Sequence, residues 1–178
     1  MHRTTVVSAL ALTAALLTAA SPASAGTPAA SGAGTGTGWE PAPTAPFDAA
    51  AGARCDFPVH GEPVVDEVVR KVLATHRDGS PSEIAYRGAL VIRLTNTGTG
   101  AFHDADASGS ALVDYHADGS QRWHAVGPVL AGIGEDNGNL PRGEQLIDGV
   151  YTLDISATGY KTLHMIHGST DDICARIG

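Results

Sequence analysis

Residues 111–126 read ALVDYHADGSQRWHAV. Apolar and polar side chains alternate on both sides of the tripeptide ADG at positions 117–119, which is typical of strands that bury one face. An Asp-Gly pair between two such runs favours a hairpin turn, because both residues tolerate a positive φ. The stretch is therefore predicted to form two antiparallel strands.

The register of this hairpin depends on the length of its loop. A two-residue loop would set Asp114 opposite Trp123, which pairs an acid with an apolar ring. A three-residue loop, with Gly119 in the left-handed bulge position, sets Val113 opposite Trp123 and Asp114 opposite Arg122. This second register agrees with the alternation on both strands, and it is the one we predict.

Other regions show strand patterns of different clarity. Residues 86–97 and 149–156 alternate apolar with mostly polar side chains, and residues 160–167 follow the second run as the other strand of a hairpin. In residues 64–76, apolar pairs recur every four positions, as on a helix face, but five valines favour a strand. We expect a strand there, with a helix as the alternative.

These patterns predict one all-β domain, an antiparallel β-sandwich or a closed β-barrel of about seven to nine strands. The apolar faces of the strands supply the expected core: Leu90, Ile92, Leu94, Val113, Trp123, Val126, Leu153, Ile155 and Leu163.

The composition agrees with this fold class and excludes one class of partner. With 178 residues, the chain has room for one ordinary domain. Its 22 glycines and 17% charged residues suit a turn-rich β protein better than a helical one. A formal net charge of −8 argues against nucleic acid, which requires a basic surface to meet the phosphates.

The first 25 residues are predicted to be a signal peptide. Arg3 supplies the positive charge, residues 6–20 are uncharged and apolar, and Ala23-Ser24-Ala25 matches the cleavage pattern. The apolar run is shorter than the roughly 20 residues that span a bilayer. We therefore expect a secreted, extracellular protein without a membrane span after cleavage.

Residues 26–53 are predicted to be a flexible leader. They consist mostly of Gly, Ala, Thr, Ser and Pro, with Trp39 and Phe47 as the only aromatic residues. Such a segment buries too little apolar surface to offset the entropy lost on ordering. The β domain is then expected over residues 54–178.

Cys55 and Cys174 are the only cysteines of the chain. In an oxidising compartment such a pair favours a disulfide, which would join the two ends of the domain. A loop of this size stabilises by about 4 to 5 kcal/mol in the chain-entropy model. The alternative, a catalytic thiol, needs a His partner that no spacing indicates.

One set of candidate metal ligands lies on the first hairpin. Asp114 and His116 share the outer face of a predicted strand, and His124 lies nearby across the hairpin. These three side chains could hold Zn²⁺ with one open position. Exposed polar residues of a strand give the same pattern, which we favour.

A second set matches the first half of a calcium loop. Asp104, Asp106 and Ser108 supply oxygen at positions one, three and five, and Gly109 follows at position six. The second half fails, because Tyr115 stands where the bidentate Glu belongs. We favour a polar turn at the end of a strand and predict no cofactor.

Signatures of catalysis are missing from the sequence, so the catalytic residues stay unknown. There is no Gly-x-Ser-x-Gly elbow for a nucleophile. The carboxylate pairs Asp171-Asp172 and Glu135-Asp136 lie in predicted turns, where adjacent acids are usually solvated.

Several short motifs recur together in one order: CDFPV at 55–59, LTN at 94–96 with TG at 99–100, YHADGS at 115–120, GPVL at 127–130 and DIC at 172–174. In this the chain resembles small exported proteins of actinobacteria whose function is uncharacterised. The resemblance implies an all-β secreted domain bracketed by its cysteine pair. It also implies a strand at 64–76, and at 104–109 a strand that runs into a Ser-Gly turn. It brings no established activity.

The function expected from these observations is noncatalytic binding of a ligand, an envelope component or a protein outside the cell. A secreted hydrolase with an Asp/His-based site is one alternative. A metal-binding extracellular domain that uses Asp114, His116 and His124 is the other.

Overall fold

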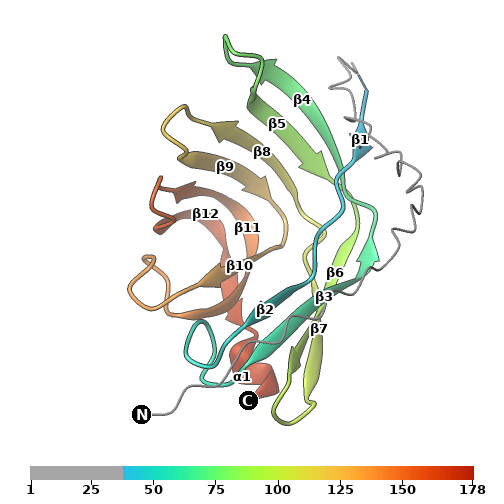
Figure 1. The fold of residues 1–178 in the computed structure, drawn as a ribbon, viewed down its shortest axis with the longest axis vertical. Helices are drawn as coiled ribbons and strands as arrows, with labels where there is room; N and C mark the ends of the chain where they lie inside the picture. The colour runs from blue at the N-terminus through green and yellow to red at the C-terminus, as the bar shows by residue number, and fades with distance from the viewer. Residues whose placement is uncertain (1–37) are drawn as a thin grey trace, which may run out of the picture. The chain divides into compact units, whose positions relative to one another are not determined.

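The computed structural model describes residues 38–178, so the predicted signal peptide lies outside the described residues. Twelve strands form two antiparallel sheets in this part of the chain, and one four-residue helix, α1 (Cys174–Ile177), ends it (Figure 1). The larger sheet contains β1 (Glu40–Pro41), β4 (Val69–Thr75), β5 (Pro81–Arg87), β8 (Ser110–Tyr115), β9 (Gln121–Val126), β10 (Val129–Ile133), β11 (Gly143–Ile155) and β12 (Lys161–Asp172). The smaller sheet contains β2 (Phe47–Ala49), β3 (Val59–Asp66), β6 (Leu90–Asn96) and β7 (Phe102–Asp106).

The prediction of an all-β antiparallel domain is confirmed, but two of its details are wrong. The larger sheet runs in the order β1-β4-β5-β8-β9-β11-β10 with β12 also on β11, and the smaller runs β2-β3-β6-β7. Neither sheet closes into a barrel. The expected seven to nine strands are too few, because two predicted strands break in two and the segment predicted as a leader adds β1 and β2.

The hairpin of β8 and β9 has the predicted register. Val113 lies opposite Trp123 and Asp114 lies opposite Arg122. Gly119 has a φ of +85°, and its amide donates a hydrogen bond to the carbonyl oxygen of His116 at 3.0 Å. The three-residue loop with a left-handed glycine is confirmed.

The stretch at 86–97, predicted as one strand, is two strands in different sheets. β5 ends at Arg87 in the larger sheet, and β6 begins at Leu90 in the smaller. Between them Gly88 has a φ of +140°, and a Cβ there would lie 2.3 Å from the carbonyl oxygen of Glu67. The two backbone segments pass so close to each other that only glycine fits at position 88, and the chain bends there into the other sheet.

Residues 64–76 are extended, as predicted, but they too divide between the sheets. β3 ends at Asp66 and β4 begins at Val69, beside the break after β5. The amide of Glu67 donates to the carbonyl oxygen of Ala89 at 2.8 Å. The two breaks are thus hydrogen-bonded to each other and form a common corner.

The hairpin predicted at 149–156 and 160–167 is confirmed and is longer than expected. β11 pairs with β12 from Gln145 to Ile155, beyond both predicted strands. On its other side, residues 143–147 pair with β10 and residues 150–155 pair with β9. β11 is therefore the central strand of this half of the larger sheet.

The leader prediction is corrected for residues 38–53. β1 pairs with β4 and β2 pairs with β3, so this segment adds a strand to each sheet. The Arg87 guanidinium lies 4.1 Å from the ring centroid of Trp39, and Phe47 packs against the core of the smaller sheet. These two aromatic contacts, together with strand pairing, supply the ordering energy that the composition did not indicate.

Two hydrophobic clusters hold the sheets. Ile92, Leu94, Val113 and Leu153 are buried as predicted. Four more predicted core residues are partly buried and pack at the margins of these clusters: Leu90, Trp123, Ile155 and Leu163. One predicted core residue does not. That exception is Val126, which is 59% exposed, so its assignment to the core is wrong. It ends β9 next to the turn and faces solvent.

The predicted disulfide is confirmed. Cys55 and Cys174 are bonded, with their Cα atoms 5.5 Å apart. The bond ties the loop before β3 to the start of α1. Nearby, the buried Asn96 donates to the carbonyl oxygen of Ile177 at 3.0 Å, which fixes the end of α1 against β6.

Candidate functional site

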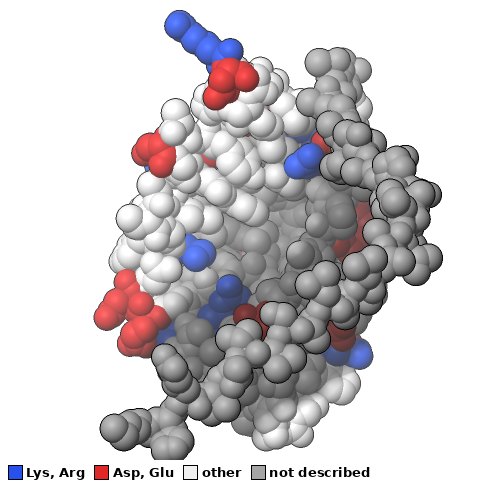
Figure 2. Space-filling view, viewed as in Figure 1, with Lys and Arg blue, Asp and Glu red and all other residues white. Residues whose placement is uncertain are grey.

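A cavity of about 260 Å³ lies between the two sheets. Its walls come from residues 42–44 before β2, from β5, β6, β8 and β9, and from the start of β10. Most of the residues that line it are apolar. The complete lining is Ala42, Thr44, Val68, Tyr86, Arg87, Gly88, Leu90, Ile92, Ala107, Gly109, Ser110, Ala111, Trp123, Val129 and Leu130. The face drawn in Figure 1 is hollowed near its centre in the space-filling view, and most acidic side chains there lie toward the margin (Figure 2).

A run of short side chains creates this space. Residues 107–111 read ASGSA, and four of these five residues line the cavity. Ala111 lies opposite Tyr86 on one side and Ala125 on the other. A Cβ on Gly109 would lie 2.4 Å from the carbonyl oxygen of Pro128, so the backbone itself closes this wall. Any larger side chain at position 111 would occupy the cavity.

Two aromatic rings form one wall. The rings of Tyr86 and Trp123 are parallel to within 3°, with centroids 6.2 Å apart. The Tyr86 hydroxyl is hydrogen-bonded to the Tyr115 hydroxyl at 2.9 Å, and Trp123 Nε1 donates to Gln121 Oε1 at 3.0 Å. Burial and this hydroxyl pair raise the pKa of Tyr115, which stays neutral. The polar atoms of the rings have partners, so the rings offer apolar surface to the cavity.

Residues 39–49, which we call the strap, roof the cavity. Ala42 and Thr44 line it from above. The Ala42 amide donates to the carbonyl oxygen of Val68 at 2.9 Å, and the Thr44 amide donates to Asp66 Oδ2 at 2.6 Å. These bonds hold the strap across the corner where β3 passes into β4. Part of the cavity wall thus comes from within the segment that was predicted to be a flexible leader.

A partly buried ion pair lies at the other end of the sheets. Glu144 of β11 is 1% exposed, and its Oε1 accepts a hydrogen bond from Arg54 Nη1 at 2.7 Å. Its Oε2 is buried without a hydrogen-bond partner among the described residues. Burial raises the pKa of Glu144, against the opposing effect of Arg54, and burial lowers the pKa of Lys161 close by.

The surroundings of Arg54 explain how a guanidinium fits there. A Cβ on Gly132 of β10 would lie 2.4 Å from the Arg54 Cζ, and the ring of Phe47 lies 4.9 Å from the same atom. The guanidinium thus lies between a glycine backbone and an aromatic face. No local sequence pattern indicates this pair, because its two members are 90 positions apart.

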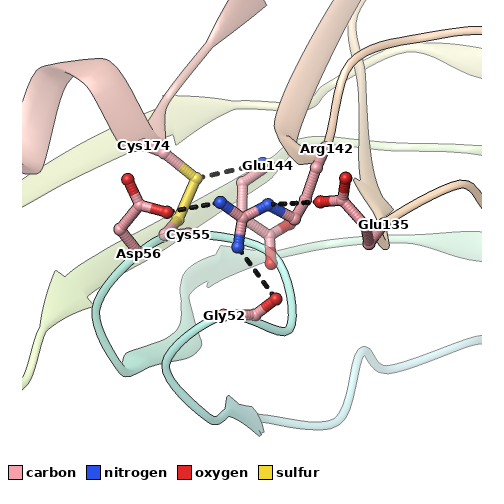
Figure 3. A network of polar contacts seen from close by, with 7 residues as sticks. All are labelled: Gly52, Cys55, Asp56, Glu135, Arg142, Glu144 and Cys174. Carbon is pink, nitrogen blue, oxygen red and sulfur yellow. Dashed lines mark hydrogen bonds and ion pairs between the residues drawn. A yellow bond between two sulfur atoms is a disulfide. The ribbon is translucent and has the colours of Figure 1, made fainter.

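Glu144 also contacts the disulfide. Its amide donates to the sulfur of Cys174 at 3.3 Å (Figure 3). Next to this contact, Arg142 holds three groups of the neighbouring loops: Asp56, Glu135 Oε2 at 3.1 Å and the carbonyl oxygen of Gly52 at 2.8 Å. Both acids are largely exposed, so these contacts position the loops more than they stabilise the fold.

The predicted zinc ligands come together only in part. His124 Nε2 lies 3.3 Å from Asp114 Oδ2. His116 is exposed and lies just beyond the end of β8 at Tyr115. Residues 38–178 contain no group of three His, Cys, Asp or Glu side chains arranged to hold a metal ion.

The residues of the half-matched calcium loop make separate contacts. Asp104 accepts two hydrogen bonds from the Arg93 guanidinium, at 2.7 and 2.8 Å. Asp106 Oδ1 instead accepts the amide of Ser108 at 3.0 Å, and the Ser108 hydroxyl accepts the amide of Leu90 at 2.9 Å. β7 ends at Asp106, so the expected strand is present, and residues 107–109 link it to β8 in the larger sheet.

A second, wider recess lies between two turns of similar sequence. Residues 76–80 read HRDGS and residues 116–120 read HADGS, at the ends of the β4–β5 and β8–β9 hairpins. His76, Asp78, Ser80 and His116 are among the residues that line it. The repeated HxDGS pattern is the signal in the sequence that indicates this pair of similar turns.

The polar groups of this recess are engaged with one another. Asp78 Oδ1 accepts the amide and the hydroxyl of Ser80, at 2.9 and 2.6 Å, and these bonds lower the pKa of Asp78. His76 Nε2 lies 2.9 Å from the carbonyl oxygen of Tyr115. The same Asp-to-Ser bonds recur in the second turn, between Asp118 and Ser120. The arrangement is that of a stabilised turn.

The carboxylate pairs have different surroundings from those predicted. Asp171 and Asp172 lie at the end of β12, not in a turn. Asp171 is paired with Arg176 at 2.7 Å, and Asp172 accepts the amide of Cys174 at 3.0 Å. Glu135 and Asp136 do lie in the turn between β10 and β11.

No protein-family model matches the chain, and no curated protein or solved structure gives a significant match to it. Across residues 38–178, no helix has the length and apolarity needed to cross a membrane.

Proposed function

We propose that this protein is an extracellular, noncatalytic binding protein that holds a small molecule in the cavity between its two sheets. The observation that carries the proposal is the cavity itself. It is a partly open recess lined by residues of both sheets and of the strap, and two parallel aromatic rings form one of its walls. Concave, mostly apolar sites with few polar groups are typical of small-molecule binding.

The lining supports binding over catalysis. Among the described residues that line the cavity there is no His, Asp, Glu or Cys, and Arg87 is the one charged residue. Thr44 and Ser110 could serve as nucleophiles only with a base beside them, and the lining offers no His or carboxylate for that role. The same composition favours a small molecule over an envelope polymer or a protein, which would need a more open surface.

The proposal of an extracellular location rests on the predicted signal peptide, and the disulfide agrees with it. The chain should be expressed from residue 1 in an exporting bacterial host. We expect the protein from the medium to begin at Gly26 by intact-mass analysis. Protein that stays inside the cells with residues 1–25 attached would refute the location.

Binding itself can be tested with a library of small uncharged compounds and ligand-detected NMR. We expect hits that compete for one site and that lose binding in Ala111→Leu, which fills the cavity. Ala157→Leu is the matched control, because Ala157 is exposed in the β11–β12 turn. Absence of hits at millimolar concentration, or equal binding to Ala111→Leu, would overturn the proposal.

A secreted hydrolase is the second candidate, and the recess between the two HxDGS turns favours it, because His and Asp side chains meet there. Its weakness is that Ser80 donates to Asp78 and that His76 contacts a backbone oxygen. Hydrolysis of a chromogenic ester by the wild type that disappears in both His76→Ala and Ser80→Ala would support it. Equal rates of hydrolysis by the wild type and both variants would exclude this recess as the active site.

A further inference from the structure

We infer that the ligand of the cavity is a flat, uncharged and largely apolar molecule of about ten non-hydrogen atoms, stacked against Tyr86 and Trp123. This inference rests on the proposed binding function and narrows it to one chemical class. Three properties of the cavity carry it: its volume, the geometry of its aromatic wall and the charge of its lining.

The volume sets the size of the ligand. An apolar cavity of about 150 Å³ holds one benzene ring, with six carbon atoms. Scaled to the 260 Å³ of this cavity, the same packing gives about ten non-hydrogen atoms. This is the size of a fused two-ring compound, and it is smaller than a typical drug or a fatty acid of membrane-lipid length.

The aromatic wall sets the shape. The rings of Tyr86 and Trp123 are parallel to within 3°, so their planes have the same orientation beside the cavity. A planar ligand that stacks on the free face of one ring lies parallel to both, and it adds stacking to the burial of its surface. A puckered ring system of the same carbon skeleton keeps its hydrogens between the surfaces and loses this contact.

The lining sets the charge. Arg87 is exposed and its guanidinium lies 4.1 Å from the centroid of Trp39, on the strap. The other polar side chains of the lining are hydroxyls, from Thr44, Ser110 and Tyr86. A charged ligand buried there would lack a buried counter-charge, which is costly. A single hydroxyl or carbonyl on the ligand is accommodated.

Three related probes test the inference: 2-naphthol is flat and neutral, decahydro-2-naphthol is its saturated form, and 2-naphthoate is flat and charged. Binding is measured from backbone amide shifts of the ¹⁵N-labelled protein. We expect 2-naphthol to bind about tenfold or more tightly than either other probe. Its largest shifts should lie at residues 86, 111 and 123.

Variants distinguish ligand stacking on the aromatic rings from simple occupation of the cavity. Trp123→Leu should reduce the preference of 2-naphthol over its saturated form, because one of the two ring faces is lost. Ala111→Leu should abolish binding of all three probes, and Ala157→Leu should leave all affinities unchanged. Equal affinity of the flat and saturated probes in the wild type, or tighter binding of 2-naphthoate, would overturn the ligand class.

Xenon distinguishes this failure from failure of the proposed function. Xenon enters apolar cavities without regard to planarity. If xenon shifts the same amides and the naphthols do not, the ligand class is wrong and the cavity remains a binding site. If neither xenon nor any of the three probes enters the wild-type cavity, both proposals fall.

Discussion

Gly149 of β11 lies directly opposite Gly168 of β12, and each has a φ of +140°. A Cβ on Gly149 would lie 2.0 Å from the carbonyl oxygen of His167, and a Cβ on Gly168 would lie 2.0 Å from that of Asp148. The two backbones therefore touch at a point where neither residue can carry a side chain.

Replacing either glycine by alanine should destabilise the fold by at least about 3 kcal/mol, because the new methyl group overlaps backbone atoms and the φ is unfavourable. Gly119→Ala is the matched control: its φ is +85°, but nothing lies within 4 Å of a Cβ there. We expect about 1 to 2 kcal/mol for the control. Urea unfolding measures both, and equal losses would contradict the clash.

The Arg54–Glu144 pair predicts a pH-dependent variant. Arg54→Ala leaves a buried carboxylate without its partner and should cost about 3 kcal/mol at neutral pH. Because burial raises the pKa of Glu144 above its ordinary value of 4.5, acid protonates this group readily, and the loss should shrink as the pH falls. The double variant Arg54→Ala/Glu144→Gln should recover most of the stability. If the stability lost in Arg54→Ala is the same from pH 5 to 8, it does not depend on the ionisation of Glu144, and the prediction is wrong.

The same raised pKa of Glu144 determines how the stability of the wild type changes with pH. Folded protein keeps the Glu144 proton to a higher pH than unfolded protein does, so this group's contribution to stability decreases as the pH rises from 4.5 through the raised pKa. Glu144→Gln removes this slope. The comparison of unfolding free energies across that interval tests it.

Loss of the Cys55–Cys174 bond should cost about 2 to 5 kcal/mol, because the unfolded chain regains the freedom of a long loop. The double variant Cys55→Ala/Cys174→Ala measures this cost without a reductant. Thiol titration of denatured wild type should find no free thiol, and two free thiols would contradict the bond in the isolated protein.

The contact between Trp39 and Arg87 should couple the strap to β5 by about 0.5 to 1 kcal/mol. A double-mutant cycle of Trp39→Ala and Arg87→Ala measures the coupling from unfolding free energies. Amide exchange of Ala42, which is hydrogen-bonded to Val68, should become faster in both single variants. Additive effects with unchanged exchange would mean that the strap is held by its backbone alone.

The parts of the fold that depend on local order could be predicted from the sequence. The register of β8 against β9 follows from alternation plus one glycine, and both are visible in residues 111–126. Alternation also identifies the buried face of β6 and of β11. It cannot show where a strand leaves its sheet, because the break at Gly88 is set by the approach of Glu67 from another strand.

The candidate site was less predictable for the same reason. The cavity depends on Ala111 lying next to Tyr86, a pairing between strands that no local pattern specifies. The polar residues that the sequence indicates include Asp114 and His124, which do meet, and His116, which lies just beyond the end of β8. Short side chains that leave space are chemically silent, so a search for reactive groups overlooks them.

The strap has a practical consequence for recombinant work. Composition alone suggests starting the expressed domain at residue 54, where the run of small residues ends. Such a protein would lack Ala42 and Thr44, which roof the cavity, and Phe47, which packs on the smaller sheet. It would retain the disulfide and most of both sheets while its cavity stood open to water. A binding assay on that fragment would report a protein without affinity, and the first residue of the clone would be the cause.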